Sequence, residues 1–154
     1  MIEITKRPAF APAPCYRDVR AAIRFLQDAF GFEVSMIIAD ADDNILHSEM
    51  SFGGGIVMVG SEWSDDHRSP ANVGGKNTQS IHVHLEEDID AHCQRARKAG
   101  AHVLQEPATQ FYGDRTYRAR DLEGHIWTFG QTVDHMTSAQ WDAAMPGIKT
   151  RTTL

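Results

Sequence analysis

The chain has 154 residues, with 15 Lys and Arg against 21 Asp and Glu, which gives a formal net charge of −6. This length suits one domain with its own hydrophobic core, and an acidic chain lacks the basic face expected of a protein that binds nucleic acid. The two cysteines, Cys15 and Cys93, have no metal-binding spacing, and no apolar run is long enough to span a membrane. We therefore expect a cytoplasmic protein with no nucleic-acid or membrane partner.

The first part of the chain predicts one helix between extended segments. Three prolines between residues 8 and 15 favour an extended or edge strand. Asp18 is a good N-cap for the helix that follows, because apolar residues then recur at steps of three and four as far as Gly31. Turn-forming Asp, Asn and Gly residues separate the strands expected next, which cover residues 33–39, 45–52 and 56–60.

The same order of elements recurs in the second half of the chain. Residues 61–79 are rich in Ser, Asp, Pro, Asn and Gly, which is typical of a long connector. An alternating strand at 80–86 is followed by a helix that Asp88 caps and Gly100 ends, about 70 residues after the first helix. Such an internal repeat predicts two tandem β-α-β-β-β units.

A turn at Asp121-Leu-Glu-Gly124 predicts a hairpin that closes the second unit. The strand before the turn alternates charged and apolar residues, and the strand after it carries Trp127 and Phe129, which we expect to pack against a helix. By the same alternation, Tyr117 and Ala119 share one face of their strand, and Thr116 and Arg118 share the other. The tail, residues 135–154, is expected to hold a short helix near residues 140–145.

Five motifs in this order resemble one known family: residues 16–32, residues 47–53, residues 88–92, residues 98–101 and the corner at 123–125. The family is the vicinal oxygen chelate superfamily, which contains glyoxalase I, bleomycin-resistance proteins and extradiol dioxygenases. Leu122 stands where many members have proline, and the resemblance covers about residues 8–132. It implies an α+β fold in which two units form curled mixed sheets around a ligand-binding cup. The expected domain is 1–134, with units 8–60 and 80–132, connector 61–79 and tail 135–154.

The resemblance also implies four metal-ligand positions, and in this chain they fall at or near Ala11, Met58, Ser80 and Thr128. None of these side chains is a strong ligand for a divalent ion. We therefore expect no metal or other cofactor, as in the metal-free bleomycin-resistance-like members. An alternative metal site consists of His82 and His84, which alternate with apolar residues and should both face the cup, with Cα atoms about 7 Å apart. His47 and Glu49, similarly spaced on another strand, could complete it.

We expect the cup to bind a small molecule that is anionic or planar. Arg118 and Thr116 should face the cup if Tyr117 faces the helix, and guanidinium groups pair with carboxylates and stack on rings. Trp63 and Tyr112, from connecting segments, could close over the apolar part of the ligand. The full predicted ligand-binding set is His47, Glu49, Trp63, His82, His84, Tyr112, Thr116, Arg118 and Thr128.

An enzyme, a lyase, isomerase or dioxygenase, is the alternative function. Glu49 beside His47 is the acid–base pair that the sequence suggests, whereas nucleophile-elbow, phosphate-loop and dinucleotide motifs are absent. A homodimer is also expected, both from the resemblance and because sheet edges and the tail residues Trp141 and Met145 would otherwise be exposed.

Overall fold

The structure, a computed structural model, describes residues 7–154. The predicted domain starts at residue 1, so its first six residues lie outside this description. The first unit contains β1 (Cys15–Tyr16), α1 (Val19–Phe25), a π-helical turn (Leu26–Phe30), β2 (Glu33–Ala39), β3 (Ile45–Phe52), β4 (Gly55–Met58) and β5 (Gly60–Ser61). The second contains β6 (Ile81–Leu85), α2 (Ile89–Lys98), β7 (His102–Thr109), β8 (Asp114–Arg120) and β9 (Ile126–Thr132).

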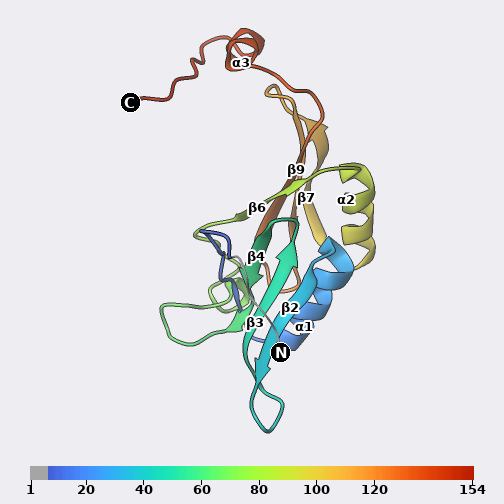
Figure 1. The fold of residues 1–154 in the computed structure, drawn as a ribbon, viewed down its shortest axis with the longest axis vertical. Helices are drawn as coiled ribbons and strands as arrows, with labels where there is room; N and C mark the ends of the chain where they lie inside the picture. The colour runs from blue at the N-terminus through green and yellow to red at the C-terminus, as the bar shows by residue number, and fades with distance from the viewer. Residues whose placement is uncertain (1–6) are drawn as a thin grey trace.

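The two units have similar strand pairings, but the first unit is divided into two sheets. In the second, the order is β6-β9-β8-β7, and β6 runs parallel to β9 while the other neighbours are antiparallel. In the first, β2-β3-β4 form an antiparallel sheet and β1 runs parallel to β5. Helices α1 and α2 lie on the same side of the strands (Figure 1). The predicted α+β fold is confirmed, including the β-α-β-β-β order of each half.

The first helical segment begins after Asp18 and ends at Gly31, as the sequence predicts, but its last turn is of a different type. The Asp18 side chain accepts a hydrogen bond from the Ala21 amide at 2.9 Å, and Gly31 closes the helix with φ of 77°. The last turn is π-helical, and the Arg95 guanidinium of α2 donates to the carbonyls of Gln27 and Asp28 in it, both at 2.8 Å. Steps of three and four residues could not reveal this wider turn.

One aromatic core joins the two units. The ring of Phe30 lies 5.5 Å from Trp127 and 4.7 Å from Phe129, and the ring of Phe32 lies 5.5 Å from Trp127, between centroids. Trp127 and Phe129 are fully buried, as predicted, and so is Tyr117. Because α1 and β9 belong to different units, this cluster fixes the first unit on the second.

The corner between β8 and β9 is a second link between the units. Asp121 Oδ2 accepts hydrogen bonds from the Tyr16 hydroxyl at 2.7 Å and from Trp127 Nε1 at 3.0 Å. Glu123 accepts from the amides of Arg17 and Asp18, just before α1, at 2.8 and 3.0 Å. Both carboxylates are buried, and each accepts at least one hydrogen bond from the first unit.

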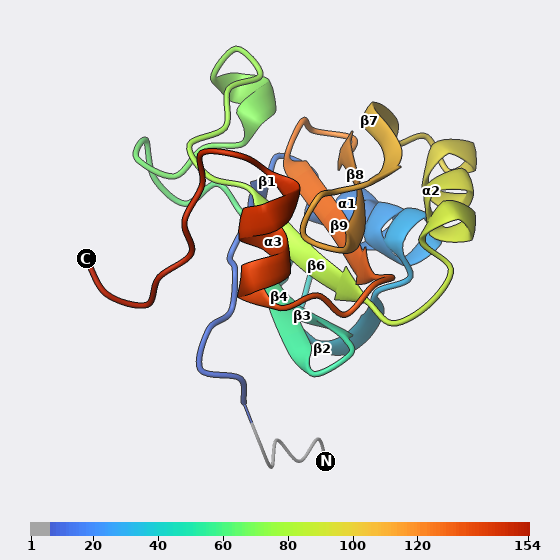
Figure 2. The ribbon, with the colours of Figure 1, turned by 90° about the horizontal axis from the view of Figure 1, so that it is seen from above.

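The remaining segments depart from expectation in detail. The strand expected at 56–60 is interrupted at Val59, whose amide and carbonyl both bond to Ser48. The connector contains a 3-10 turn at Pro70–Asn72 and stands out on the side away from α2 (Figure 2). The tail forms α3 (Ser138–Ala144), where Trp141 Nε1 donates to the Tyr112 carbonyl at 3.0 Å. No helix within residues 7–154 is long and apolar enough to cross a membrane.

Candidate functional site

Three predicted ligand-binding residues form one row across the second sheet. His82 on β6 lies level with Thr128 on β9, and Thr128 lies level with Arg118 on β8. The residues that alternate with them pack under the helices, so the row lies on the opposite side, which we call the open face of the second sheet. Arg118 Nε donates to Thr128 Oγ1 at 3.2 Å, so the guanidinium is held against the row.

The next row on the open face contains His84, Gly130 and Thr116. A Cβ atom at Gly130 would lie 3.0 Å from Nε2 of His82, so the absence of a side chain there leaves room for the imidazole. Thr116 is buried and its hydroxyl accepts a hydrogen bond from Gln110 Nε2 at 3.1 Å. Of this row, the exposed imidazole of His84 is available to a ligand.

Arg120 belongs to the same face and was not in the predicted set. It is two residues beyond Arg118 on β8, and a Cβ at Gly75 of the connector would lie 3.8 Å from its Nη1. Its Nε is buried and has no hydrogen-bond partner. In the part of the chain that the structure describes, neither Arg118 nor Arg120 forms a salt bridge, whereas Arg115 on the same strand pairs with Asp90. The strand alternation that pointed to Arg118 also covers Arg120, and could have found it.

Glu49 and His47 lie on β3 of the first unit and form a separate cluster. Glu49 is buried, and its Oε1 accepts hydrogen bonds from Arg7 Nη1 at 2.8 Å and His47 Nε2 at 3.1 Å. Burial acts to raise the pKa of this carboxyl, but the hydrogen bonds from Arg7 and His47 outweigh it and the pKa lies below its usual value. Glu49 is thus a stabilised carboxylate.

The structure does not join all the predicted residues into one site. The hydrogen bonds and ion pairs of residues 7–154 do not connect Glu49 or His47 with the row on the second sheet. Trp63, in the connector, is 75% exposed and lies beside His67, with ring centroids 5.1 Å apart. Tyr112 lies in the turn between β7 and β8, where its carbonyl bonds to the tail.

The donor set does not fit the metal that the fold family often holds. Two of the four metal-ligand positions that the resemblance implies can be compared with the strand register. Met58 pairs with Glu49, and Thr128 pairs with His82, which lies two residues beyond Ser80. His82 is thus one strong donor, but the Thr128 hydroxyl beside it is bonded to a guanidinium, whose charge opposes a cation. Across the described positions, no three His, Cys, Asp or Glu side chains are grouped to hold an ion, so His82 and His84 have no further ligand.

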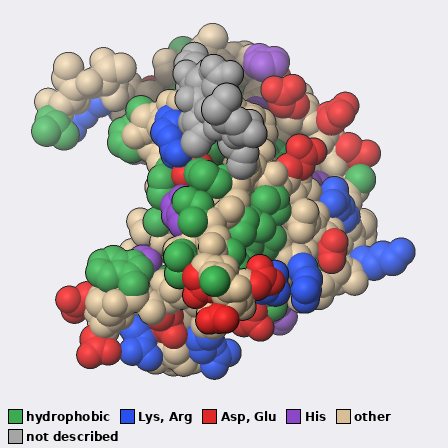
Figure 3. Space-filling model, turned by 60° about the horizontal axis from the view of Figure 1, so that its bottom comes forward, with side chains coloured by type: hydrophobic (Ala, Val, Ile, Leu, Met, Phe, Trp, Pro, Cys, Tyr) green, Lys and Arg blue, Asp and Glu red, His purple; other side chains and the backbone are tan. Residues whose placement is uncertain are grey.

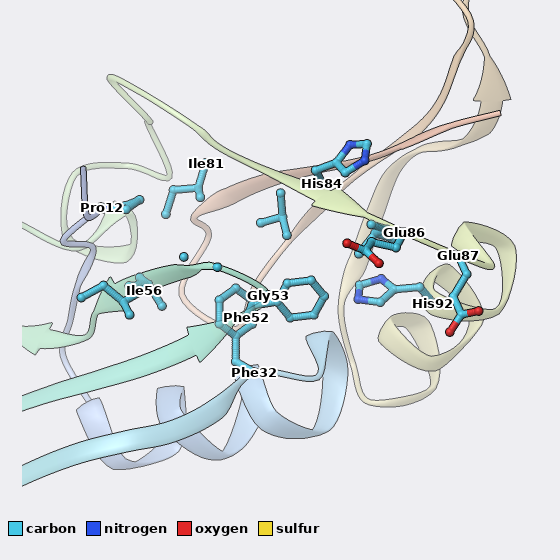
Figure 4. A pocket seen from close by; sticks show the side chains of 15 residues that line it. Pro12, Phe32, Phe52, Gly53, Ile56, Ile81, His84, Glu86, Glu87 and His92 are labelled. Carbon is cyan, nitrogen blue, oxygen red and sulfur yellow. The ribbon is translucent and has the colours of Figure 1, made fainter. Parts of the chain in front are cut away.

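A cavity of about 550 Å³ opens where the two units meet, between the start of β4 and strand β6 (Figure 4). Most of its lining is apolar, and among the predicted ligand-binding residues only His84 borders it. His92, on α2, contributes one wall. Burial lowers the pKa of His92, and both ring nitrogens are bonded: Nε2 donates to the Phe30 carbonyl at 2.9 Å and Nδ1 accepts from the Tyr117 hydroxyl at 2.6 Å.

Comparison with known proteins places the fold in a wider set. Residues 13–129 match the family model described as Glyoxalase/Bleomycin resistance protein/Dioxygenase superfamily. An uncharacterized protein of Mycobacterium tuberculosis (strain ATCC 25618 / H37Rv) is 30% identical over 146 residues, which cover 92% of this chain and 85% of the relative. TioX from Micromonospora sp. ML1 is 32% identical and has a TM-score of 0.65 over 84% of this chain and 100% of TioX. TnmS3, an antibiotic binding protein from Streptomyces sp. CB03234, is 14% identical and shares the fold with a TM-score of 0.63 over 84% of this chain and 99% of TnmS3.

Proposed function

The chain belongs to the Glyoxalase/Bleomycin resistance protein/Dioxygenase superfamily, and from that premise we propose that it is a metal-free protein that binds a small acidic molecule on the open face of its second sheet. One observation carries the proposal. Arg118 and Arg120 lie on one strand face without a carboxylate partner among the described residues, although the chain as a whole is acidic.

The chemistry of the open face favours an acidic ligand with a planar part. A guanidinium presents a rigid fork of N–H donors that matches a carboxylate, and its flat surface stacks on rings. The Thr128 hydroxyl and the exposed His82 imidazole add hydrogen-bonding groups on the same row. A buried, unpaired Nε, as in Arg120, has a free energy cost that a bound acceptor would remove. TnmS3 is described as an antibiotic binding protein, so one fold relative serves small-molecule binding.

Binding is favoured over acid–base catalysis because of the state of Glu49. An efficient general base has a pKa near the operating pH, whereas the two hydrogen bonds to Glu49 hold its pKa below the usual value for a glutamate. Its Oε1 is also already bonded to Arg7 and His47. These contacts suit an anchoring carboxylate better than a proton acceptor.

We also propose a homodimer in the cytoplasm. Ile37 and Ile38 on β2 and Leu46 on β3 are exposed apolar side chains of the first sheet, and β2 is an edge strand. In Figure 3, hydrophobic side chains gather near the middle of the face in view, with acidic and basic side chains mixed around them. That distribution suits a partner with an apolar centre better than a nucleic acid.

A charge-matched pair of variants tests the ligand site. We would screen small carboxylic acids, with and without a planar ring, by thermal shift, and measure the best binder by calorimetry. Arg118→Ala should weaken binding by about 1.5 to 3 kcal/mol, the range of a charge-assisted hydrogen bond. Arg24→Ala is the control, because it removes the same charge from an exposed position on α1. Equal affinities of the wild type and both variants would refute the site.

A further inference from the structure

The cavity between the units lies at the junction of the two sheets, and His84 is the residue of the open-face rows that borders it. Its lining includes Val57, Ile81 and Val83, which alternate with residues of the other face and pack against or beside the core. Figure 4 shows β6 on one side of it, and the turn before β4 and the end of the first helical segment on the other. None of His82, Thr128 and Arg118 lines the cavity, so it is a separate place from the row that these residues form.

The body of the cavity suits a planar apolar group. Phe32 and Phe52 form an aromatic wall, with ring centroids 5.2 Å apart and planes at 43°. Ile56 and Ile81 supply aliphatic surface. His92 adds only the surface of its ring, since both of its nitrogens are occupied by Phe30 and Tyr117. Apolar walls with few polar groups are typical of small-molecule sites, and this volume falls within their usual range of about 300–1,000 Å³.

One end of the cavity carries a negative charge. Glu86 borders the cavity beside His92, and Figure 4 shows its carboxylate on the cavity side of the strand, whereas Glu87 points away. Within residues 7–154 no salt bridge involves Glu86, and the lining includes no Lys or Arg. A ligand with an anionic end would be repelled here, and a cationic end would be attracted.

We propose that this cavity is a second binding site, which takes an amphipathic cation: a planar apolar body against Phe32 and Phe52, and an ammonium group at Glu86. The site differs from the row of His82, Thr128 and Arg118 in both position and charge preference. It does not rest on the proposed acid-binding function, and each can fail without the other.

Three naphthalene probes that differ only in charge test the site by calorimetry: 1-naphthylmethylammonium, 1-naphthylmethanol and 1-naphthylacetate. We expect binding of one probe per chain, with the cation about two- to fivefold tighter than the alcohol, the range of an exposed ion pair, and the anion weakest. Glu86→Gln should remove the preference for the cation and retain the alcohol. Glu33→Gln, an exposed charge on β2, is the matched control.

Filling the cavity gives an independent test. Ile56→Phe and Val83→Phe each place a ring in the space, and each should weaken the cation and the alcohol at least tenfold in a protein that still melts cooperatively. Two filling variants are used so that one remains if the other does not fold. Arg118→Ala should leave the affinity for the cation unchanged, because Arg118 does not line the cavity.

Several results would overturn the proposal. They are equal affinity for the three probes, unchanged binding to a folded filling variant, or loss of cation binding in Arg118→Ala, which would place the probe on the open face. A filling variant could also change the oligomeric mass in solution while it still binds the probe. That result would show that the cavity is a contact between copies of the chain, and it would refute the proposed binding site.

Discussion

Replacing Tyr16 with phenylalanine tests how the corner holds the two units together. The Tyr16 hydroxyl donates to Asp121 Oδ2 at 2.7 Å, and both residues are buried. Burial, followed by the neighbouring Asp121 carboxylate, raises the pKa of Tyr16 well above its usual value, so the hydroxyl stays protonated and donates. A hydrogen bond to a charged group contributes about 1.5–3 kcal/mol to stability.

The structure puts the expected loss near the lower end of that range. Asp121 keeps three other donors, which are Trp127 Nε1 and the amides of Glu123 and His125, each at 3.0 Å. Tyr16→Phe should therefore lower the free energy of unfolding by about 1.5 kcal/mol, whereas Asp121→Ala leaves all four donors without an acceptor and should cost about 3 kcal/mol or more. Urea unfolding followed by tryptophan fluorescence measures both changes.

Tyr112→Phe is the control for this experiment. Tyr112 is 36% exposed, and its hydroxyl has no hydrogen-bond partner among the described residues. Its replacement should change the free energy of unfolding by less than about 0.5 kcal/mol. If Tyr16→Phe and Tyr112→Phe had the same small effect, the corner would not link the units in the way that we infer.

Three further outcomes are expected. Elemental analysis of the purified protein should find no stoichiometric divalent metal; one tightly bound zinc, nickel, iron or manganese ion per chain, lost in His82→Ala, would contradict the donor-set argument. Light scattering should give about twice the chain mass of 17.2 kDa at micromolar concentration, and a monomer mass at all concentrations would be inconsistent with a dimer. The free energy of unfolding should fall as the pH drops below about 6.5. In that range His92 becomes protonated in the unfolded chain, whereas burial keeps the pKa of His92 in the folded protein lower. His92→Gln should flatten this fall between pH 7.5 and 5.5, and an unchanged pH profile would exclude His92 as its source.

Periodicity along the chain was enough to predict most of the fold. The cap at Asp18 and the ending at Gly31 place α1 within one turn, and the same two signals place α2. The alternation on β8 put Tyr117 and Arg118 on opposite faces, because successive side chains of a strand point to opposite sides, and the structure shows that Tyr117 is the buried one. These are local properties, so one sequence is sufficient.

The errors concern features set by residues far apart in the chain. The π-helical turn accepts hydrogen bonds from Arg95, which lies more than 60 residues further along the chain. Thr128 pairs with His82 and not with Ser80 because of the parallel register of β6 and β9. No local sequence pattern encodes that register. The salt bridge between Arg7 and Glu49 and the cavity between the units likewise arise only when distant segments meet.

The central claim is tested most directly by the side-chain Nε–Hε signals of Arg118 and Arg120 in an NMR titration with the best carboxylic acid from the screen. Arg118→Ala, Arg120→Ala and Arg24→Ala each assign one signal, and the Arg24 signal is the control. We predict that the signals of Arg118 and Arg120 shift together with one binding constant, along with the amides of His82 and Thr128, while the Arg24 signal stays in place. Shifts confined to residues that line the cavity between the units, or shifts at Arg24 as large as those at Arg118, would contradict an acid-binding site on the open face of the second sheet.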